Sequence, residues 1–337
     1  MSRARRGGGA VALAVAATFV GLVCPASAAW ADSTRDRQWP LAFLKVAEAQ
    51  RYSQGAGVIV AVIDSGVDAS HPDLAGSVLS GIDAQPGASG NGWTDTDGHG
   101  TGMAGLIVAH GHGPGGSLGV VGIAPQAKIL PVKDGASAGT AVADGIAWAT
   151  NHGAKVISIS EGSADDDPRE RAAVEQAIAR DIVVVAGAGN LPGQGVDYPA
   201  AYPGVVAVAG VDQHGNHAEV SLTGPQVVLS APAVDVIRPA VDHGYALGTG
   251  TSDATAIDRG PSGRDDVYGY GIVNLVGALT ADVPPLATPS ASPDPTTGAA
   301  SSPPTGRSPW LIVGLGVVLV VVAALGLLLV ARRRTPG

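Results

Sequence analysis

Apolar, mostly β-branched runs recur through the middle of the chain and predict buried β-strands. The first run, at residues 57–63, reads Gly-Val-Ile-Val-Ala-Val-Ile and contains no charged position. A continuous apolar run of this length is typical of a parallel strand that is covered on both faces. The further predicted strands are residues 127–132, 155–159, 182–186, 205–211 and 227–231.

Two longer segments between these runs have helix-like patterns. They are residues 138–152 and residues 168–180, and each lies between two predicted strands. Strands that alternate with helices at this spacing predict an α/β fold, with a mostly parallel sheet and helices on both of its faces. In such sheets, functional residues gather at the carboxyl ends of the strands.

The first 31 residues have the pattern of a secretory signal peptide. Arginines precede an apolar run at residues 10–23, and small residues at 26–28 or 29–31 offer a cleavage site. An uncleaved N-terminal anchor is the alternative. The only cysteine, Cys24, follows a valine rather than a small residue, which argues against a lipoprotein signal. Its removal with the signal peptide would leave no cysteine for an internal disulfide.

The C-terminal end has the pattern of a membrane anchor. Residues 310–331 form an apolar run of 22 residues without a charge, followed by a basic tail at 332–337. At about 1.5 Å per residue such a helix spans a bilayer core of about 30 Å. The arginines of the tail predict a cytoplasmic C-terminus and an extracellular body.

The folded domain is expected within residues 32–282. Residues 283–309, which separate it from the apolar run, hold eight prolines among small and polar residues and predict an extended linker. The net charge of the chain is −9, which argues against a nucleic-acid-binding surface.

Three polar residues stand where catalytic groups would be expected. Asp64 ends the first predicted strand, His99 lies in a glycine-rich segment at 95–105, and Ser252 follows a turn of small residues. Taken singly, each has a common structural role as a helix cap, a loop residue or a turn residue. Together they supply a nucleophile, a base and a carboxylate that orients the base, the set required for nucleophilic acyl transfer. Their chain order is that of subtilisin.

Four stretches together resemble the subtilisin-like serine proteases, the subtilases of peptidase family S8. They are Val62-Ile63-Asp64-Ser65-Gly66, Gly98-His99-Gly100-Thr101, Gly250-Thr251-Ser252, and residues 183–190 with the Tyr-Pro pairs that follow them. The resemblance covers about residues 39–279 and implies a three-layer sandwich around a mostly parallel sheet. With the signal peptide, linker and membrane helix, the chain is most similar to the mycosins, membrane-anchored subtilases that accompany type VII secretion systems.

The resemblance implies a polypeptide substrate and a role for each matched residue. Asp64, His99 and Ser252 would form the catalytic triad, and Asn190 with the backbone N–H of Ser252 would form the oxyanion hole. A strand that pairs with an extended substrate peptide would comprise Ser158, Ile159, Ser160, Glu161 and Gly162. Because Glu161 replaces a residue that is apolar in many relatives, we hypothesise that it favours basic or polar substrate side chains.

The chain departs from the subtilase pattern in three places. About 25 residues separate the predicted signal cleavage site from the first strand, too few for the globular prodomain of many subtilases. Ala256 stands where the motif usually has a proline. After Ile257 the sequence soon reaches Gly260-Pro261, which would end a helix, and residues 263–274 already resemble the closing segment of the family.

The long buried helix that follows the serine in subtilases is therefore predicted to be mostly missing. Its loss would expose apolar surface and leave Ser252 poorly held, so we expect activity that is weak, absent or dependent on a partner. The alternative to a membrane-anchored endopeptidase is a catalytically impaired, subtilase-like scaffold or binding subunit of the secretion machinery.

Three further motifs have functional alternatives that the sequence disfavours. Gly187-Ala188-Gly189 vaguely resembles a dinucleotide-binding turn, but no helical pattern follows it. His110 and His112 lack a third ligand at metal-binding spacing. The acidic run at 165–167 is more typical of a solvated loop before a helix than of a calcium site. We therefore predict neither a metal ion nor a cofactor.

Overall fold

The computed structural model describes residues 33–135, 140–191, 194–254, 266–272 and 274–280 of the chain. Three predicted segments lie outside these ranges: the signal peptide, the proline-rich linker and the C-terminal membrane helix. The helices within the described ranges are all too short or too polar to cross a membrane. Residues 255–265, where the sequence predicts an interrupted helix, also lie outside them.

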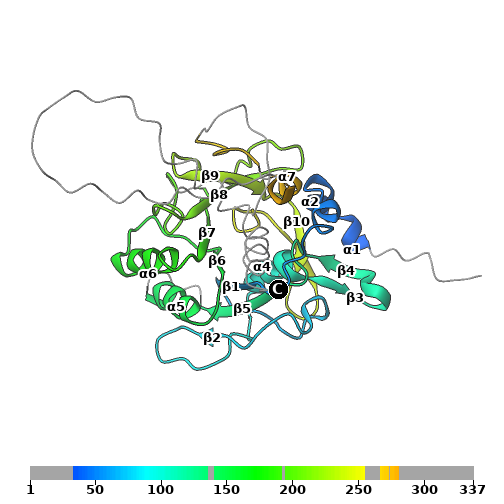
Figure 1. Cartoon of the computed structure of the whole chain (residues 1–337), viewed down its shortest axis with the longest axis horizontal. Coiled ribbons are helices and arrows are strands. Elements are labelled where there is room, and N and C mark those ends of the chain that lie inside the picture. Colours follow the sequence, from blue (N-terminus) through cyan, green and yellow to red (C-terminus); the bar gives the residue numbers. More distant parts are fainter. Residues whose placement is uncertain (1–32, 136–139, 192–193, 255–265, 273, 281–337) are drawn as a thin grey trace, which may run out of the picture. The chain divides into compact units, whose positions relative to one another are not determined.

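Seven parallel strands form the central sheet (Figure 1). Their order in space is β2 (Ile82–Asp83), β5 (Lys128–Lys133), β1 (Ile59–Asp64), β6 (Val156–Ile159), β7 (Val183–Gly187), β8 (Val206–Val211) and β9 (Val227–Pro232). Each strand runs parallel to its neighbours, which confirms the predicted sheet. Because β1 lies between β5 and β6, the carboxyl ends of these three strands meet at one edge.

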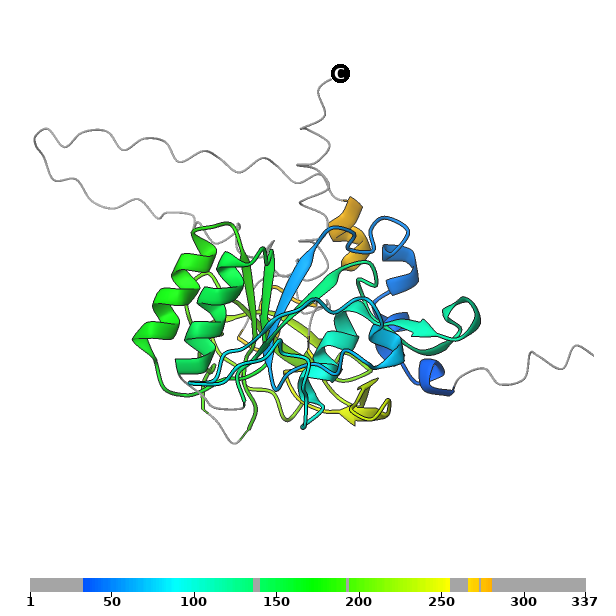
Figure 2. The same cartoon turned by 90° about the horizontal axis from the view of Figure 1, so that it is seen from below.

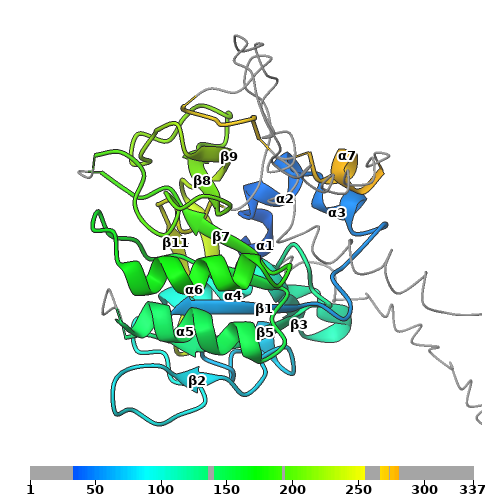
Figure 3. The ribbon, with the colours of Figure 1, turned by 60° about the vertical axis from the view of Figure 1, so that its left-hand side comes forward.

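Helices cover both faces of the sheet and give three layers (Figure 2). α4 (His99–Val108) packs on one face. α5 (Thr140–Asn151) and α6 (Pro168–Ile178) lie side by side on the other, where Figure 3 shows them in front of the strands. The strand–helix alternation predicted this arrangement, because a parallel connection needs a crossover that returns over a face of the sheet.

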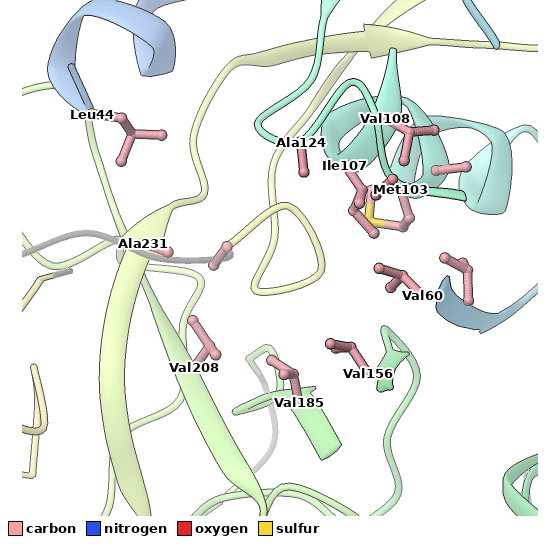
Figure 4. Packing of buried hydrophobic residues seen from close by; sticks show 14 of the residues in the cluster. Leu44, Val60, Met103, Ile107, Val108, Ala124, Val156, Val185, Val208 and Ala231 are labelled. Atoms are coloured by element: carbon pink, nitrogen blue, oxygen red, sulfur yellow. The ribbon is translucent and has the colours of Figure 1, made fainter. Parts of the chain in front are cut away.

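Alternate side chains of β1 enter two separate hydrophobic clusters. Val60 and Val62 belong to the cluster that contains Met103 of α4 (Figure 4). Ile63 belongs to the second cluster, with Ile146 of α5. Since consecutive strand residues point to opposite faces, a strand that is covered on both sides must be apolar at every position.

The remaining elements are short. They are α1 (Ser33–Asp36), α2 (Trp39–Phe43), α3 (Val46–Ala49), the 3₁₀ turns at Pro72–Leu74 and Pro114–Gly116, the antiparallel pairs β3 (His110–His112) with β4 (Leu118–Val121) and β10 (Val236–Pro239) with β11 (Tyr245–Gly248), and α7 (Leu275–Thr280). Hydrogen bonds fasten the N-terminal helices to the rest. Gln38 donates to the carbonyl of Val121 and accepts from its N–H, each at 2.9 Å, and the Trp39 indole donates to the Val234 carbonyl at 3.1 Å.

A segment that resembles the end of the subtilase fold runs beside β9. Tyr270 donates its N–H to the Val228 carbonyl at 2.8 Å, and Ser230 donates to the Gly271 carbonyl at 3.3 Å. Ile272 forms a parallel bridge with Ser230. The outer side of this edge strand therefore has a short backbone partner.

Ile146→Ala is expected to lower the free energy of unfolding by about 2–5 kcal/mol, because the truncation leaves a cavity between α5 and the sheet. The Ile146 side chain is completely buried there. Denaturant unfolding of the full chain measures the change. Gln176→Ala, on the exposed side of α6, is the control and should change the value by less than about 0.5 kcal/mol. An equal loss of unfolding free energy in the two variants would contradict the placement of Ile146 in the core.

Candidate active site

Predicted site residues lie at the carboxyl ends of three adjacent strands. Asp64 is the last residue of β1, Ser160 follows β6, and Asn190 lies just beyond β7. β1 pairs with β6 and β6 pairs with β7, so these ends meet at one edge of the sheet. His99, at the start of α4, and Ser252, in a turn after β11, reach the same edge from other parts of the chain.

Asp64 and His99 are in direct contact at this edge of the sheet. Nδ1 of His99 lies 2.8 Å and 2.9 Å from the two carboxylate oxygens of Asp64. The Asp64 side chain is 1% exposed and that of His99 is 27% exposed. Burial lowers the pKa of His99, but the hydrogen bond and the charge of Asp64 outweigh it, so the pKa lies above its ordinary value. The contact fixes Nδ1 as the nitrogen that faces the carboxylate and leaves Nε2 on the opposite edge of the ring.

The start of α4 is held close to β1 by two features of the segment around His99. A Cβ at Gly100 would lie 2.1 Å from the Gly66 carbonyl oxygen, so only glycine allows this approach. The Asp95 carboxylate accepts from the N–H groups of Gly98 and Thr101, at 2.9 Å and 3.0 Å. It also accepts from the Ser65 hydroxyl at 3.0 Å.

Asp95 supports the site, although no motif in the sequence predicts a role for it. Burial raises its pKa, but the hydrogen bonds from Thr101, Gly98 and Asp97 outweigh burial and hold the pKa below its ordinary value. An aspartate shortly before a helix start is a recognisable capping signal. Its effect here is to fix the backbone that presents His99.

Ser252 is half-buried, and its hydroxyl points to β6 rather than to His99. Oγ donates to the carbonyl oxygen of Ser160 at 3.0 Å. Within the described part of the chain no hydrogen bond joins Ser252 to His99. The described residues 250–254 form a turn and no helix. The structure therefore joins Asp64 to His99 directly. It brings Ser252 to the same edge, but without a hydrogen bond between Ser252 and His99.

Asn190 lies against the turn that carries Ser252. Its Oδ1 accepts from the N–H of Thr251 at 2.9 Å, and the N–H of Gly189 donates to the Thr251 hydroxyl at 3.2 Å. Among the described residues, neither Nδ2 of Asn190 nor the backbone N–H of Ser252 has a hydrogen-bond partner. Both groups are thus available to bind a negatively charged oxygen.

The predicted substrate strand begins inside β6 and continues beyond it. Ser158 and Ile159 are buried members of β6, whereas Ser160 to Gly162 follow the strand. Ser163 then pairs with Tyr198 through two backbone hydrogen bonds of 2.9 Å and 2.8 Å. Within the described chain no backbone hydrogen bond engages Glu161 or Gly162, which leaves a short extended edge for an added strand.

Glu161 shares this edge with a second carboxyl group. Asp134, which follows β5 and is fully buried, donates its N–H to the Asp64 carbonyl at 3.0 Å. Burial, followed by the charge of Asp134 and a hydrogen bond to it, raises the pKa of Glu161 to about 8. Glu161 is therefore mostly protonated at pH 7.

The histidines of β3 have structural partners. Nδ1 of His112 lies 2.6 Å from Oδ1 of Asp73, and Nε2 of His110 contacts the carbonyl of Ala75 at 3.0 Å. Across the described ranges, no group of three or more His, Cys, Asp or Glu side chains is arranged to hold a metal ion.

The acidic run before α6 has structural partners at the start of that helix. The Asp167 carboxylate accepts from the N–H of Arg169 at 2.8 Å and caps the helix, and Asp166 pairs with Arg171. Both contacts stabilise the start of α6, as expected for acidic side chains at a helix N-terminus.

Asp64→Asn should lower the pKa of His99, because it removes the charge that outweighs burial. Titration of the His99 imidazole signal by NMR in the full chain measures this directly. Asp181→Asn is the control, since Asp181 lies before β7 at the opposite edge of the sheet and asparagine tolerates its left-handed backbone. A His99 pKa that does not change in Asp64→Asn would refute the electrostatic coupling described above.

Comparisons with known proteins identify the family of the chain. The model of the subtilase family, peptidase S8, matches residues 55–257. A thermostable alkaline protease of Halalkalibacterium halodurans is 41% identical over 224 residues, which cover 64% of this chain and 59% of that protease. Thermitase of Thermoactinomyces vulgaris is 37% identical over 252 residues, which cover 73% of this chain and 88% of thermitase.

Solved structures include a similar fold. MycP1 with its N-terminal propeptide removed matches 73% of this chain and 98% of its own length, with a TM-score of 0.62 and 26% sequence identity. The family match covers more than half of the chain and includes β1, α4 and the turn with Ser252. The chain therefore belongs to the subtilase family of serine endopeptidases, and among subtilases it is similar to the mycosin MycP1.

Proposed function

We propose that the chain is a membrane-anchored, extracellular endopeptidase that cleaves polypeptides through an acyl-enzyme on Ser252. The observation that carries the proposal is the double contact of His99 with Asp64, at the sheet edge that Ser252 and Asn190 share. A buried carboxylate that holds an imidazole in this way gives a base with a fixed tautomer and orientation.

The reaction begins when the Ser252 hydroxyl turns from the Ser160 carbonyl toward Nε2 of His99. As Oγ attacks the scissile carbonyl carbon, Nε2 takes the hydroxyl proton, and Asp64 stabilises the imidazolium that forms. Nε2 then gives the proton to the leaving amine. A water molecule, deprotonated by His99, hydrolyses the ester and restores Ser252.

Two donors support the negative oxygen of the tetrahedral intermediate. They are Nδ2 of Asn190 and the backbone N–H of Ser252, which have no partner within the described residues. The contact between Asn190 Oδ1 and the Thr251 N–H holds the amide beside the nucleophile. Donors that are fixed in place before the charge develops stabilise the transition state without reorganisation.

The location and the partner are part of the same proposal. The signal-peptide pattern, the linker at 283–309 and the apolar run at 310–331 favour a single-pass protein with its peptidase domain outside and its C-terminus in the cytoplasm. The likeness to MycP1 favours an association with a type VII secretion membrane complex. The acidic net charge offers no support for a nucleic-acid partner.

A scaffold or binding subunit is the second candidate function. The observation in its favour is the Ser252 hydroxyl, which is bonded to Ser160 rather than to His99. The interrupted sequence after Ile257 points in the same direction, because it removes the helix pattern that would hold the nucleophile.

Fluorophosphonate labelling of the detergent-solubilised full chain distinguishes the two functions. The probe reacts with an activated serine, so we expect labelling of the native chain and none of Ser252→Ala. A third version carries the helix of a relative inserted after Ile257. Labelling confined to that version would make the native chain an impaired protease and favour the scaffold function.

Glu161→Gln tests the hypothesis that this side chain reads the substrate. Because the pKa of Glu161 is about 8, its charge develops as the pH rises from 7 to 9. The ratio of cleavage rates for lysine-containing and leucine-containing peptides should rise about tenfold over this range in the native chain, and remain flat in the variant. Because His99 acts on both peptides alike, its own titration does not change this ratio. Glu175→Gln, on the exposed side of α6, is the matched control, and a flat native ratio would rule out the hypothesis.

A further inference from the structure

Arg238, in β10, lies between the segments that carry His99 and Ser252. Its Nη1 donates to the backbone carbonyl of His99 at 3.3 Å. Its Nε lies 3.1 Å from Oδ1 of Asp253, an ion pair whose atoms are not aligned for a hydrogen bond. Since Asp253 directly follows Ser252, a single guanidinium contacts both the start of α4 and the turn of the nucleophile.

The pair is enclosed on two sides by backbone. The Asp253 side chain is 2% exposed and that of Arg238 is 14% exposed. A Cβ at Gly102 of α4 would overlap Arg238, and one at Gly248 of β11 would overlap both partners. A carboxylate in such a place requires a charged or hydrogen-bonded partner, so the position of the turn depends on the guanidinium.

Three charged side chains act on His99 from separate segments: Asp64 at the end of β1, Arg238 in β10 and Asp253 in the turn. The two carboxylates raise the pKa of His99 and Arg238 lowers it. Burial raises the pKa of Asp253 to about 6, against the opposing effect of Arg238. Asp253 is therefore mostly ionised, and the ion pair intact, at pH 7 and above.

We propose that Arg238 is a positioning residue that, through Asp253, fixes the turn of Ser252 relative to His99. The proposal rests on the catalytic function proposed above. Other contacts tie this turn to the sheet side of the site. Thr251 contacts Gly189 and Asn190 after β7, the Ser252 hydroxyl donates to the Ser160 carbonyl after β6, and the Gly250 N–H donates to the Ala233 carbonyl after β9. The contact through Arg238 ties it to the helix that carries the base. Arginine suits this place because its planar fork presents several fixed donors, whereas lysine presents one point charge.

The test uses the full chain and two readouts, the rate of fluorophosphonate labelling and the NMR titration of His99. In Asp253→Asn the cation of Arg238 remains without its counter-charge, so the pKa of His99 should fall. Labelling should slow by about tenfold or more, since small displacements of reacting groups are costly. The double variant Arg238→Gln/Asp253→Asn removes both charges, so the His99 pKa should return toward its native value while labelling stays slow.

Arg238→Lys keeps the charge but not the fork, and should label at a rate between those of the native chain and Asp253→Asn. Asp144→Asn is the matched control, because it breaks the exposed Asp144–Arg169 pair between α5 and α6 and should change neither readout. Native labelling that Asp253→Asn leaves unchanged would overturn the proposal.

The two proposals fail in different ways. An unlabelled native chain would count against the catalytic function. The His99 titration alone would then test whether the Arg238–Asp253 ion pair acts on His99. A lowered His99 pKa in Asp253→Asn, restored in the double variant, would support the contact. An unchanged pKa would overturn it.

Discussion

A buried carboxylate at the end of β1 is the constraint on which the rest of the site depends. A carboxyl group as enclosed as that of Asp64 needs hydrogen-bond donors, and it obtains them from the Ser65 N–H and the His99 ring. For the ring to reach it, α4 must begin against the end of the strand, which requires Gly100. Once α4 is placed in this way, its apolar residues cover one face of the sheet. The hydrogen bond between His99 and Asp64 therefore depends on the same placement of α4 as the apolar packing on this face of the sheet.

Several acidic groups lie around this point, and each has a different protonation state or partner. Glu161, beside Asp134, retains its proton at neutral pH. Asp253 stays ionised because Arg238 lies next to it. Asp64 itself faces an imidazole, whose positive form it stabilises. Charges of one sign this close together would oppose one another if all were ionised and unpaired. The result is a negative environment that favours protonation of the base, the state that forms during acyl transfer.

The sequence predicted the parts of the fold that repeat a local pattern. The apolar run at 57–63 corresponds to β1, Ile59–Asp64, and the helical pattern at 168–180 to α6, Pro168–Ile178. The β10–β11 pair was not predicted, because its strands are short and contain a proline and an exposed leucine. Arg238 had no local signal either, since its partner lies in another segment. A motif identified Ser252, but the direction of its hydroxyl depends on the Ser160 carbonyl, which only the folded sheet brings near.

The hydrogen bond from Trp39 to Val234 joins residues that are 195 positions apart. β1 likewise pairs with β5 and β6 rather than with the strand that follows it in sequence. Contacts between residues this distant require the closure of long loops, and domains that are rich in them fold slowly. During synthesis, α2 has no carbonyl at Val234 to bind until nearly the whole domain has left the ribosome. The docking of α2 can therefore be completed only late in translation, although the Val121 partner of Gln38 emerges well before Val234.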